Sequence, residues 1–584
     1  MTDPLEGDDA GALQVPTVVG DVVEMGLEPV EEVVGVDGRF QWVFPPPGGT
    51  GPDPGSGARS GSPALSVWYF ALPLTSAHRG GHSGGGALVD GVDGQERYRN
   101  EGTVYPHSGL VEMITYQERY LPELPWKYVD LSHVPWDDVR AAIAADPPDV
   151  AAFTVYTATA LWAFIVAAEI KRVNPAATVV FGNDHAGILH REILTGHYGH
   201  RLVDFVSTGN NGPFTMLGLL YALRGQLDLR RVPSLAYREQ QGIVNQPAPT
   251  YPLDRRMLPD YTLIEDQLER YYDKAFDVWY AHHYDLKRMV TLPLDAGCTW
   301  GTRPGRRCKH CSIQGLTPKF ARMDTIVPAL EKVVGGLGAN VYAAGDSTLG
   351  FSRAQWSGEI GYLDELAERC AASPVLRDHR FLLAYGLVFE FLQSAKLCQG
   401  FVRTWNVGLE AFDPKLLKGD SKGINKGPDR VHEALELAQE LDYKIYASGI
   451  LGLPGTTRKQ LREEVDSWLS LAETYRDTIT TVSVAAPGVI PGSRMYWESF
   501  RTHPDVRAAH GEIIPARRLT ELYVHENTEV ELADVEAAIA DVGRGVIALG
   551  RERGHMKFGG YMLGGVDDDE AAERRLLDEI CAQL

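Results

Sequence analysis

The chain has 584 residues, and its 56 basic and 78 acidic side chains give a formal net charge of −22. This length exceeds one ordinary domain, so we expect two or three packed units. The acidic surface repels phosphate backbones, which makes nucleic acid a poor candidate for a substrate or partner.

The sequence also disfavours a membrane or secreted protein. Hydrophobic residues make up 44% of the chain, but Gly, Pro or a charge interrupts every long apolar stretch before it could span a bilayer. The first residues, MTDPLEGDDAGALQ, are acidic and lack the basic start and apolar block of a secretory signal. We therefore expect a cytoplasmic protein with no membrane partner.

The first part of the chain predicts one α/β unit after a flexible segment. Residues 1–66 show little periodicity, and Phe44–Ser66 is a linker rich in Pro, Gly and Ser. Between residues 67 and 230, buried-strand patterns alternate with helical patterns and end in glycine-containing turns. The predicted elements are the strand segments Val67–Leu74, Asp149–Thr157, Ala177–Gly187 and Leu202–Phe214 and the helix Ala158–Pro175. They predict a doubly wound sheet that binds a ligand at the loops after its strands.

The second part predicts a barrel or partial barrel. Residues 231–287 link the two units, and a new series of strand–helix units occupies residues 288–500. Its strands are predicted in MVTLPLDAGC, ANVYAAGDS, FLLAYGLV, TWNVGLEAF, YKIYASGILGLPG and TITTVSVAAPG. In such a fold the chemistry lies at the carboxyl ends of the strands. Residues 501–584 are mostly helical and are expected to form a cap.

Three of the six cysteines lie in the segment GCTWGTRPGRRCKHCSIQG, which follows the first strand of the second unit. Cys298, Cys308 and Cys311 have the spacing C-x9-C-x2-C. A disulfide framework is disfavoured in a reducing compartment, so clustered thiols indicate a metal site or catalysis. The other cysteines are scattered and are expected to be small buried hydrophobes: Cys370, Cys398 and Cys581.

Two kinds of metal site compete for the three clustered thiols. Structural zinc needs four ligands, and His310 lies so close to Cys308 and Cys311 that it cannot easily complete a tetrahedron with them. Three thiolates at one strand end suit a [4Fe-4S] cluster with one iron open to a non-cysteine ligand. We favour the iron–sulfur cluster as the metal site.

Several motifs in order resemble the cobalamin-dependent radical S-adenosylmethionine enzymes. The frame GC-x-W-G…C-x-x-C-S, then Ala343–Ser347 (AAGDS), Val407–Gly427, Gly449–Thr457 and Ala486–Tyr496 follow the family's order and spacing. The family's usual cysteine pattern is C-x3-C-x2-C, so this loop carries six extra residues. The resemblance implies a Rossmann-like cobalamin-binding domain, a partial (β/α)6 radical S-adenosylmethionine barrel and a helical C-terminal cap.

The resemblance also implies residues for S-adenosylmethionine and for the cluster. Cys298, Cys308 and Cys311 would bind the [4Fe-4S] cluster. The AAGDS turn stands where the family holds the methionine amino group, with Asp346 in the acidic place. The residues implied for S-adenosylmethionine are Gly345, Asp346, Glu410 and Gly452. Asp346 and Glu410 are also the catalytic candidates.

Cobalamin residues are implied by turns in the first unit. VFGNDHAG (Val180–Gly187) and VDFVSTGNNGPF resemble two of the family's turns, in which glycines let the backbone approach the corrin or its nucleotide tail. The residues carried over are Gly182, His185, Gly209 and Gly212. His185 is expected to hold its turn rather than to bind cobalt.

A further cobalamin contact is expected in the loop after the first strand. That loop contains His78 and Arg79 in a pattern that keeps the His and Gly of the D-x-H-x-x-G motif but lacks its Asp. A cobalt-ligating His is normally steadied by a carboxylate on its other nitrogen. Either His78 binds cobalt, or His78 and Arg79 lie near a lower face that no residue coordinates.

The implied activity is methyl transfer from S-adenosylmethionine through methylcobalamin to a carbon of a small molecule, such as a natural-product precursor, with an aromatic carbon as one possibility. An external electron donor of the flavodoxin or ferredoxin type is implied as a partner. Some relatives, such as the tryptophan methylase of thiopeptide pathways, methylate without a free radical. There a protein carboxylate blocks the fourth iron, a role for which Glu410 and Asp346 are the candidates here.

Other functions remain open at the level of the sequence. The same cofactors could rearrange or cyclise a substrate without methyl transfer. A methylthiotransferase would need RNA or a ribosomal partner and usually a second cluster, which the charge and the cysteine count disfavour. A non-enzymatic cobalamin sensor would not need the cysteine loop.

Overall fold

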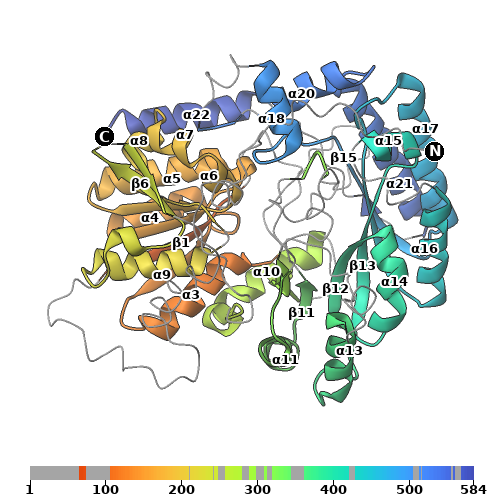
Figure 1. Cartoon of the computed structure of the whole chain (residues 1–584), viewed down its shortest axis with the longest axis horizontal. Coiled ribbons are helices and arrows are strands. Elements are labelled where there is room, and N and C mark those ends of the chain that lie inside the picture. Colours follow the sequence, from red (N-terminus) through yellow and green to blue (C-terminus); the bar gives the residue numbers. More distant parts are fainter. Residues whose placement is uncertain are drawn as a thin grey trace, which may run out of the picture.

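The computed structural model describes two large, mainly parallel sheets that are covered by helices and joined by the C-terminal helices (Figure 1). The described residues are 65–73, 105–209, 211–240, 242–246, 257–278, 288–296, 308–311, 319–343, 361–419, 428–503, 512–514, 516–553, 557–558 and 567–584. Among them, no helix is both long enough and apolar enough to cross a membrane.

The first sheet has the strand order β2-β1-β3-β4-β5-β6-β7. The strands β1 to β5 run parallel, and β6 and β7 are added antiparallel at one edge. Their bounds are β1 (Val67–Ala71), β2 (Trp126–Asp130), β3 (Val150–Thr154), β4 (Thr178–Gly182), β5 (Phe205–Ser207), β6 (Leu235–Glu239) and β7 (Gly242–Asn245). The sequence predicts a doubly wound sheet without giving a strand order, and the observed order is of this kind with an antiparallel extension.

Helices cover both faces of the first sheet. Along β1, Val67, Tyr69 and Ala71 pack on one side, and Trp68 and Phe70 pack on the other. Every residue of β1 is buried, as expected for a parallel strand between two helical layers. The layers contain α3 (Ser108–Tyr120) and α9 (Gly212–Leu223) on one side and α4 (Trp136–Ala145), α5 (Ala160–Val173), α6 (Asp184–Ile188), α7 (His190–Thr195) and α8 (Gly199–Leu202) on the other.

The second sheet has the order β16-β15-β14-β13-β12-β11-β8, and all of its described pairs are parallel. Its strands are β8 (Met289–Leu292), β11 (Asn340–Ala343), β12 (Leu382–Leu387), β13 (Val402–Glu410), β14 (Lys444–Ile450), β15 (Ile479–Ala485) and β16 (Lys557–Phe558). The first six occur in the six segments in which strands are predicted. The α/β fold class is therefore confirmed, with a sheet of successive βα units as in a partial barrel.

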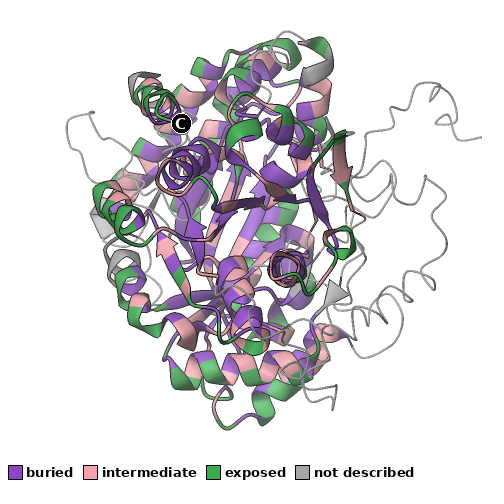
Figure 2. Ribbon diagram, turned by 90° about the vertical axis from the view of Figure 1, so that its left-hand side faces the viewer, coloured by how far each residue is buried: buried purple, intermediate pink, exposed green. Residues whose placement is uncertain are grey.

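The two faces of the second sheet differ. In β14, Ile445 and Ala447 are buried, whereas Tyr446 and Ser448 keep exposed surface. The buried side packs under helices α11 (Met323–Glu331), α13 (Tyr362–Ala372), α14 (Val388–Cys398), α16 (Pro428–Glu440) and α17 (Arg458–Thr474). Figure 2, in which the first unit faces the viewer, shows buried strands surrounded by helices whose outer sides are exposed. The other face, which we call the inner face, is more polar and more accessible.

The C-terminal region, which the sequence predicts as a helical cap, packs on both units (Figure 1). Helix α21 (Leu532–Arg553) packs on α17, and α22 (Asp567–Cys581) packs on α5 of the first unit. The Trp162 indole N–H donates to Glu573 at 3.1 Å, and the Tyr198 hydroxyl donates to Asp578 at 2.7 Å. The chain therefore returns to the first unit after the second is complete. The remaining helices are α10 (Glu265–Val278), α15 (Pro414–Gly419), α18 (Arg494–Thr502) and α20 (Ala516–Asn527).

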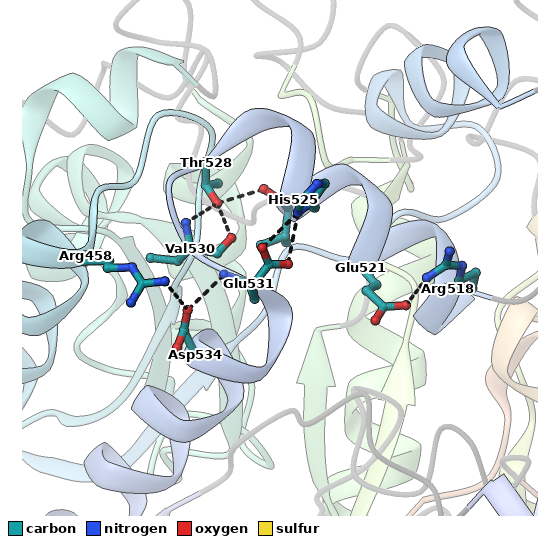
Figure 3. Close-up of polar contacts among 9 residues, drawn as sticks. Arg458, Arg518, Glu521, His525, Thr528, Val530, Glu531 and Asp534 are labelled. Atoms are coloured by element: carbon teal, nitrogen blue, oxygen red, sulfur yellow. Dashed lines mark hydrogen bonds and ion pairs between the residues drawn. The ribbon is translucent and has the colours of Figure 1, made fainter.

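Local polar contacts fix the turn between α20 and α21 (Figure 3). The Thr528 hydroxyl oxygen lies 2.7 Å from the Val524 carbonyl oxygen and 2.8 Å from that of Val530, and it can donate its proton to either. His525 Nδ1 lies 2.9 Å from a carboxylate oxygen of Glu531, and Arg458 of α17 lies 3.9 Å from Asp534. These contacts join α20, α21 and the outer helical layer of the second sheet.

A buried carboxylate joins the C-terminal region to the first unit. Glu512 is 6% exposed, and its two oxygens accept the backbone N–H groups of Tyr198 and Gly199, each at 2.7 Å. Burial raises the pKa of Glu512, while the two N–H donors lower it. One carboxylate therefore satisfies two donors at the start of α8.

We predict that Glu512→Gln loosens this junction. An amide has only one acceptor oxygen, so one buried N–H loses its partner at a cost of about 1–3 kcal/mol. Amide hydrogen exchange of residues 196–202, measured by mass spectrometry, should quicken by about 5- to 150-fold. The matched control, Glu498→Gln, removes an exposed pair with Arg494 on α18 and should leave this exchange unchanged. Equal exchange in both variants would contradict the assigned role.

Candidate functional site

The cysteine segment leaves the second sheet directly after its first strand. Beyond β8, strand β9 (Asp295–Ala296) pairs antiparallel with β10 (Lys319–Phe320), which brings together the two ends of the cysteine segment. The Leu294 carbonyl at the base of this loop accepts the Ala321 N–H at 3.0 Å and the Tyr362 hydroxyl at 3.3 Å. The base of the cysteine segment is thereby held at the carboxyl end of β8.

Two of the three clustered cysteines lie in one described turn. The Cys311 N–H donates to the Cys308 carbonyl at 3.3 Å, and both residues are partly buried. Between them, the Lys309 carbonyl accepts the Met495 N–H at 3.0 Å, which ties the turn to the start of α18. Cys298 lies outside the described residues, so the three-thiol site stays a prediction. No group of three potential ligands occurs among the residues that the structure describes.

Polar side chains of neighbouring strands share the inner face. Asn406 of β13 stands in register between Tyr385 of β12 and Tyr446 of β14. In the next row, Gly408 is paired with Ser448, whose hydroxyl lies 3.2 Å from the Asn406 amide oxygen. Hydroxyl and amide groups can both donate and accept hydrogen bonds, so this face suits a polar small molecule.

Glu410 ends β13 in a strained conformation. Its φ of 68° lies in the left-handed region, and the residue is only 5% exposed. A Cβ added to Gly408 would lie 2.6 Å from Glu410 Oε1 and 3.5 Å from the Tyr385 hydroxyl. The carboxylate therefore folds back over Gly408, beside Tyr385, at the carboxyl end of the sheet. A strained, non-glycine residue at such a place is characteristic of functional sites.

A second buried carboxylate supports the loop that follows Glu410. Glu464 of α17 accepts the Phe412 N–H at 2.9 Å and the Asp413 N–H at 2.8 Å. Burial raises the pKa of Glu464, and these two donors oppose that shift. Phe412 also packs edge-on against Trp468. The loop after β13 is thus held from the outer helical layer.

The other residues expected to bind S-adenosylmethionine are only partly placed. Gly452 has a φ of 80°, and a Cβ there would lie 2.7 Å from Val535 of α21. Glycine is required both by this backbone conformation and by the close approach of α21. Gly345 and Asp346 lie outside the described residues, so their roles stay predictions.

The glycine turns of the first sheet gather at its carboxyl edge. Gly182 ends β4 beside Ser207 at the end of β5, and Gly209 follows β5. Gly212 begins α9, and no atom lies within 4 Å of the place that its Cβ would occupy. The buried Ser207 hydroxyl has no hydrogen-bond partner among the described residues. A polar ligand at this edge would satisfy that orphaned group, so the edge fits the polar part of a corrinoid.

His185 is held within its turn. Its Nδ1 lies 3.1 Å from the Thr157 hydroxyl, and its Nε2 lies 3.1 Å from the Glu512 carbonyl oxygen. The residue is 1% exposed. Both ring nitrogens are therefore engaged by protein groups. His78 and Arg79 lie outside the described residues.

The sequence analysis misses a histidine at the same edge. His107 caps α3: its Nδ1 accepts the Leu110 N–H, while its Nε2 lies 3.1 Å from the Thr154 hydroxyl and 3.0 Å from the Tyr156 hydroxyl. Asn183 also donates to Thr154 at 2.9 Å. Burial lowers the pKa of His107 to about 4. The sequence feature that could have revealed His107 is the stretch YPHSGL, in which a polar capping residue directly precedes an amphipathic helix.

Tyrosines connect this edge to the inner face of the second sheet. The rings of Tyr105 and Tyr342 of β11 lie 5.9 Å apart. Burial raises the pKa of Tyr105, and the nearby phenols Tyr342, Tyr156, Tyr446 and Tyr261 raise it further. Burial also raises the pKa of Tyr342 to about 12. The two sheets therefore meet through protonated phenols.

Comparisons with known proteins give structural neighbours only. No protein-family model matches the chain, and no curated protein matches it. The structure resembles the radical S-adenosylmethionine methyltransferase TsrM from Kitasatospora setae, solved with tryptophan substrate and a S-adenosylmethionine analog. The TM-score is 0.57 at 16% identity, over 89% of this chain and 98% of TsrM.

Two further structures give the same result. TsrM with cobalamin and a [4Fe-4S] cluster bound matches with a TM-score of 0.55 at 17% identity, over 89% of this chain and 100% of TsrM. The cobalamin-dependent S-adenosylmethionine radical enzyme OxsB with aqua-cobalamin matches with a TM-score of 0.53 at 10% identity, over 89% of this chain and 80% of OxsB. The chain therefore shares the fold of TsrM and OxsB, as the motif resemblance implies.

Proposed function

We propose that this protein is a cobalamin-dependent radical S-adenosylmethionine methyltransferase that methylates a carbon of a small molecule. The observation that carries the proposal is the position of the Cys308–Cys311 turn. It belongs to a loop that begins directly after β8, the first strand of a parallel sheet of successive βα units. Loops at the carboxyl ends of such strands carry the chemistry in barrel enzymes.

The fold supports the proposal because it is found in TsrM and OxsB. One TsrM structure contains cobalamin and a [4Fe-4S] cluster, another contains tryptophan and a S-adenosylmethionine analog, and an OxsB structure contains aqua-cobalamin. The overlap extends over nine-tenths of this chain, so both of its units have a counterpart. The same cofactors are proposed here.

The chain offers suitable ligands for each cofactor. Cys308 and Cys311 are thiols on one turn, with Cys298 proposed as the third ligand of the [4Fe-4S] cluster. The carboxyl edge around Gly182 and Ser207 would hold the corrinoid. When bound, these cofactors supply the radical and methyl-transfer chemistry that amino-acid side chains do not provide.

The protein's own contribution is binding and orientation. Glu410 would hold S-adenosylmethionine through a charge-assisted hydrogen bond at the end of β13. Tyr385, Asn406 and Tyr446 would position the substrate on the inner face. The phenol rings suit an aromatic substrate, which agrees with the aromatic carbon proposed from the sequence. An external donor of the flavodoxin or ferredoxin type would supply the electron.

The test is anaerobic purification and reconstitution, followed by quantification of iron, sulfide and corrinoid. We expect about four irons per chain together with bound corrinoid. Cys308→Ala should lose most of the iron but keep the corrinoid, because the corrinoid edge belongs to the other sheet. The matched control is Cys370→Ala, which alters a buried thiol on α13 and should keep both cofactors.

The reaction class follows from product analysis. Methyl transfer adds the mass of one methylene unit to the substrate, whereas rearrangement or cyclisation adds none. One zinc per chain without corrinoid would contradict the proposed function. A corrinoid protein in which Cys308→Ala changed nothing would instead favour a cobalamin sensor.

We also predict that Glu410→Gly separates function from stability. Glycine removes the steric strain of the left-handed backbone, which costs about 1 kcal/mol in the folded state. This gain offsets the greater conformational entropy that glycine loses on folding, about 0.5–1 kcal/mol. The thermal unfolding midpoint should therefore change little. Loss of the charged hydrogen bond should weaken binding of radiolabelled S-adenosylmethionine by about 10-fold or more in equilibrium dialysis.

Asp442→Gly is the control for Glu410→Gly. Asp442 also has a positive φ, of 53°, but its side chain is exposed in the turn before β14. This variant should leave both the unfolding midpoint and S-adenosylmethionine binding close to those of the wild type. Unchanged binding in Glu410→Gly would contradict the role of the carboxylate.

A further inference from the structure

Two phenols face each other where the first unit meets the inner face of the second sheet. Tyr105 lies just before α3, and its ring centre is 5.9 Å from that of Tyr342 of β11, with the two rings tilted by 42°. In β11, Val341 and Ala343 are buried in the core beneath the outer helices, so Tyr342 between them lies on the inner face. Tyr105 therefore approaches this face from the first unit.

The hydroxyls of Tyr105 and Tyr342 have no hydrogen-bond partner in the part of the chain that the structure describes. Both residues are partly buried. Elsewhere the core supplies a phenol with an acceptor: the hydroxyl of the buried Tyr69 donates to Gln117 at 2.7 Å. Buried polar groups are nearly always paired with protein, ordered water or a ligand. The two phenols therefore leave hydrogen-bonding groups for a molecule that binds between the units.

Both hydroxyls are donors at physiological pH. Burial raises the pKa of Tyr342 to about 12. Burial also raises the pKa of Tyr105, and the neighbouring phenols, Tyr342 first among them, raise it further. A neutral phenol carries a proton that it can donate, and a buried donor left without an acceptor costs about 1–3 kcal/mol. The pair therefore favours a ligand atom that accepts hydrogen bonds.

A third donor lies on the same face. The Ser448 hydroxyl donates to the Asn406 amide oxygen at 3.2 Å, whereas the Asn406 amide nitrogen has no acceptor among the described residues. The neighbours of Asn406 in register are Tyr385 and Tyr446. These three side chains offer a donor and aromatic surface, and none of them carries a charge.

This arrangement selects the kind of ligand group that fits. A charged group that left water for neutral surroundings would lose its hydration without gaining a counter-charge. A carbonyl oxygen needs only donors, and its two lone pairs allow it to accept from two hydroxyls. Aromatic rings pack well against phenols, either offset-stacked or edge to face. An aromatic ring system with a carbonyl group meets all of these conditions.

We propose that Tyr105 and Tyr342 select the substrate by donating hydrogen bonds to a carbonyl-type oxygen on an uncharged aromatic ring system. The inference rests on the proposed function and deepens it, because it names the class of substrate and two residues that recognise it. Tyr105 belongs to the first unit and Tyr342 to the second, so both donors are present only when the two units are packed together.

The test compares two probes of nearly the same shape, α-tetralone and tetralin, which differ only in the carbonyl group. Full-length protein is reconstituted, its iron and corrinoid are quantified, and binding of each probe is measured by equilibrium dialysis. Tyr105→Phe and Tyr342→Phe each remove one donor and keep the ring. Each should weaken α-tetralone binding by about 2- to 12-fold, the range for one neutral hydrogen bond, and leave tetralin binding unchanged.

The carbonyl stretch of bound α-tetralone gives a second readout, which a merely structural role of the phenols would not change. A hydrogen bond to a carbonyl oxygen lowers its stretching frequency. Isotope-edited infrared spectra of the bound probe should therefore show a lower frequency in the wild type than in Tyr105→Phe or Tyr342→Phe.

Tyr475→Phe is the matched control. The Tyr475 hydroxyl lies 2.8 Å from His432 Nδ1 in the outer helical layer of the second sheet. Its loss should leave the binding of both probes as in the wild type. Comparable thermal unfolding midpoints of the three variants would exclude a folding defect as the cause of weaker α-tetralone binding.

Three results would overturn the inference while leaving the proposed function intact. α-Tetralone binding that is unchanged in either inner-face variant would show that its hydroxyl does not donate to the carbonyl. Equal weakening of α-tetralone and tetralin would assign the effect to ring packing. No α-tetralone binding by wild-type protein that contains iron and corrinoid would exclude this substrate class. A wild-type protein that retains neither iron nor corrinoid would overturn the proposed function itself.

Discussion

The parallel direction of the strands is the constraint on which the candidate site depends. A parallel sheet places the carboxyl ends of its strands at one edge, so residues far apart in sequence meet there. In the second sheet this edge receives the cysteine loop after β8 and Glu410 after β13, and in the first it receives Gly182 after β4 and Tyr156 after β3. The Tyr105–Tyr342 contact then brings the first sheet's edge to the inner face of the second.

Loops at such edges need internal acceptors, because their buried N–H groups cannot pair with a neighbouring strand. Two buried carboxylates supply them: Glu464 binds the loop after β13, and Glu512 binds the start of α8. Each carboxylate comes from another element, so the loops are held by tertiary structure rather than by their own sequence. Through its hydrogen bonds to Tyr198 and Gly199, Glu512 also attaches the C-terminal region to the first unit.

The sequence predicts the two sheets well because buried parallel strands are short apolar runs that end in glycine turns, as in Val67–Ala71 and Thr178–Gly182. It does not predict that α22 packs on α5, since the helix reads as a charged surface segment and its contacts use Glu573 and Asp578. His107 is missed for a similar reason: its importance arises from Thr154 and Tyr156, which become its neighbours only when β3 pairs with β1. Cys298, Asp346 and His78 lie outside the described residues.

Backbone strain gives independent support for the location of the site. Among the described residues, four non-glycine residues have positive φ: Asn183, Ser234, Glu410 and Asp442. Asn183 follows β4 and binds Thr154, Ser234 accepts the Thr208 N–H just beyond β5, and Glu410 ends β13. Only Asp442 lies in an exposed turn away from these edges.

Asn and Asp tolerate this conformation, but Glu and Ser have lower preference for it. Glycine adopts a positive φ without steric strain, as it does at Gly452 and Gly455. Glutamate instead holds this conformation at position 410, where the motif resemblance implies a residue of the site, and a strained non-glycine residue there is consistent with a functional role.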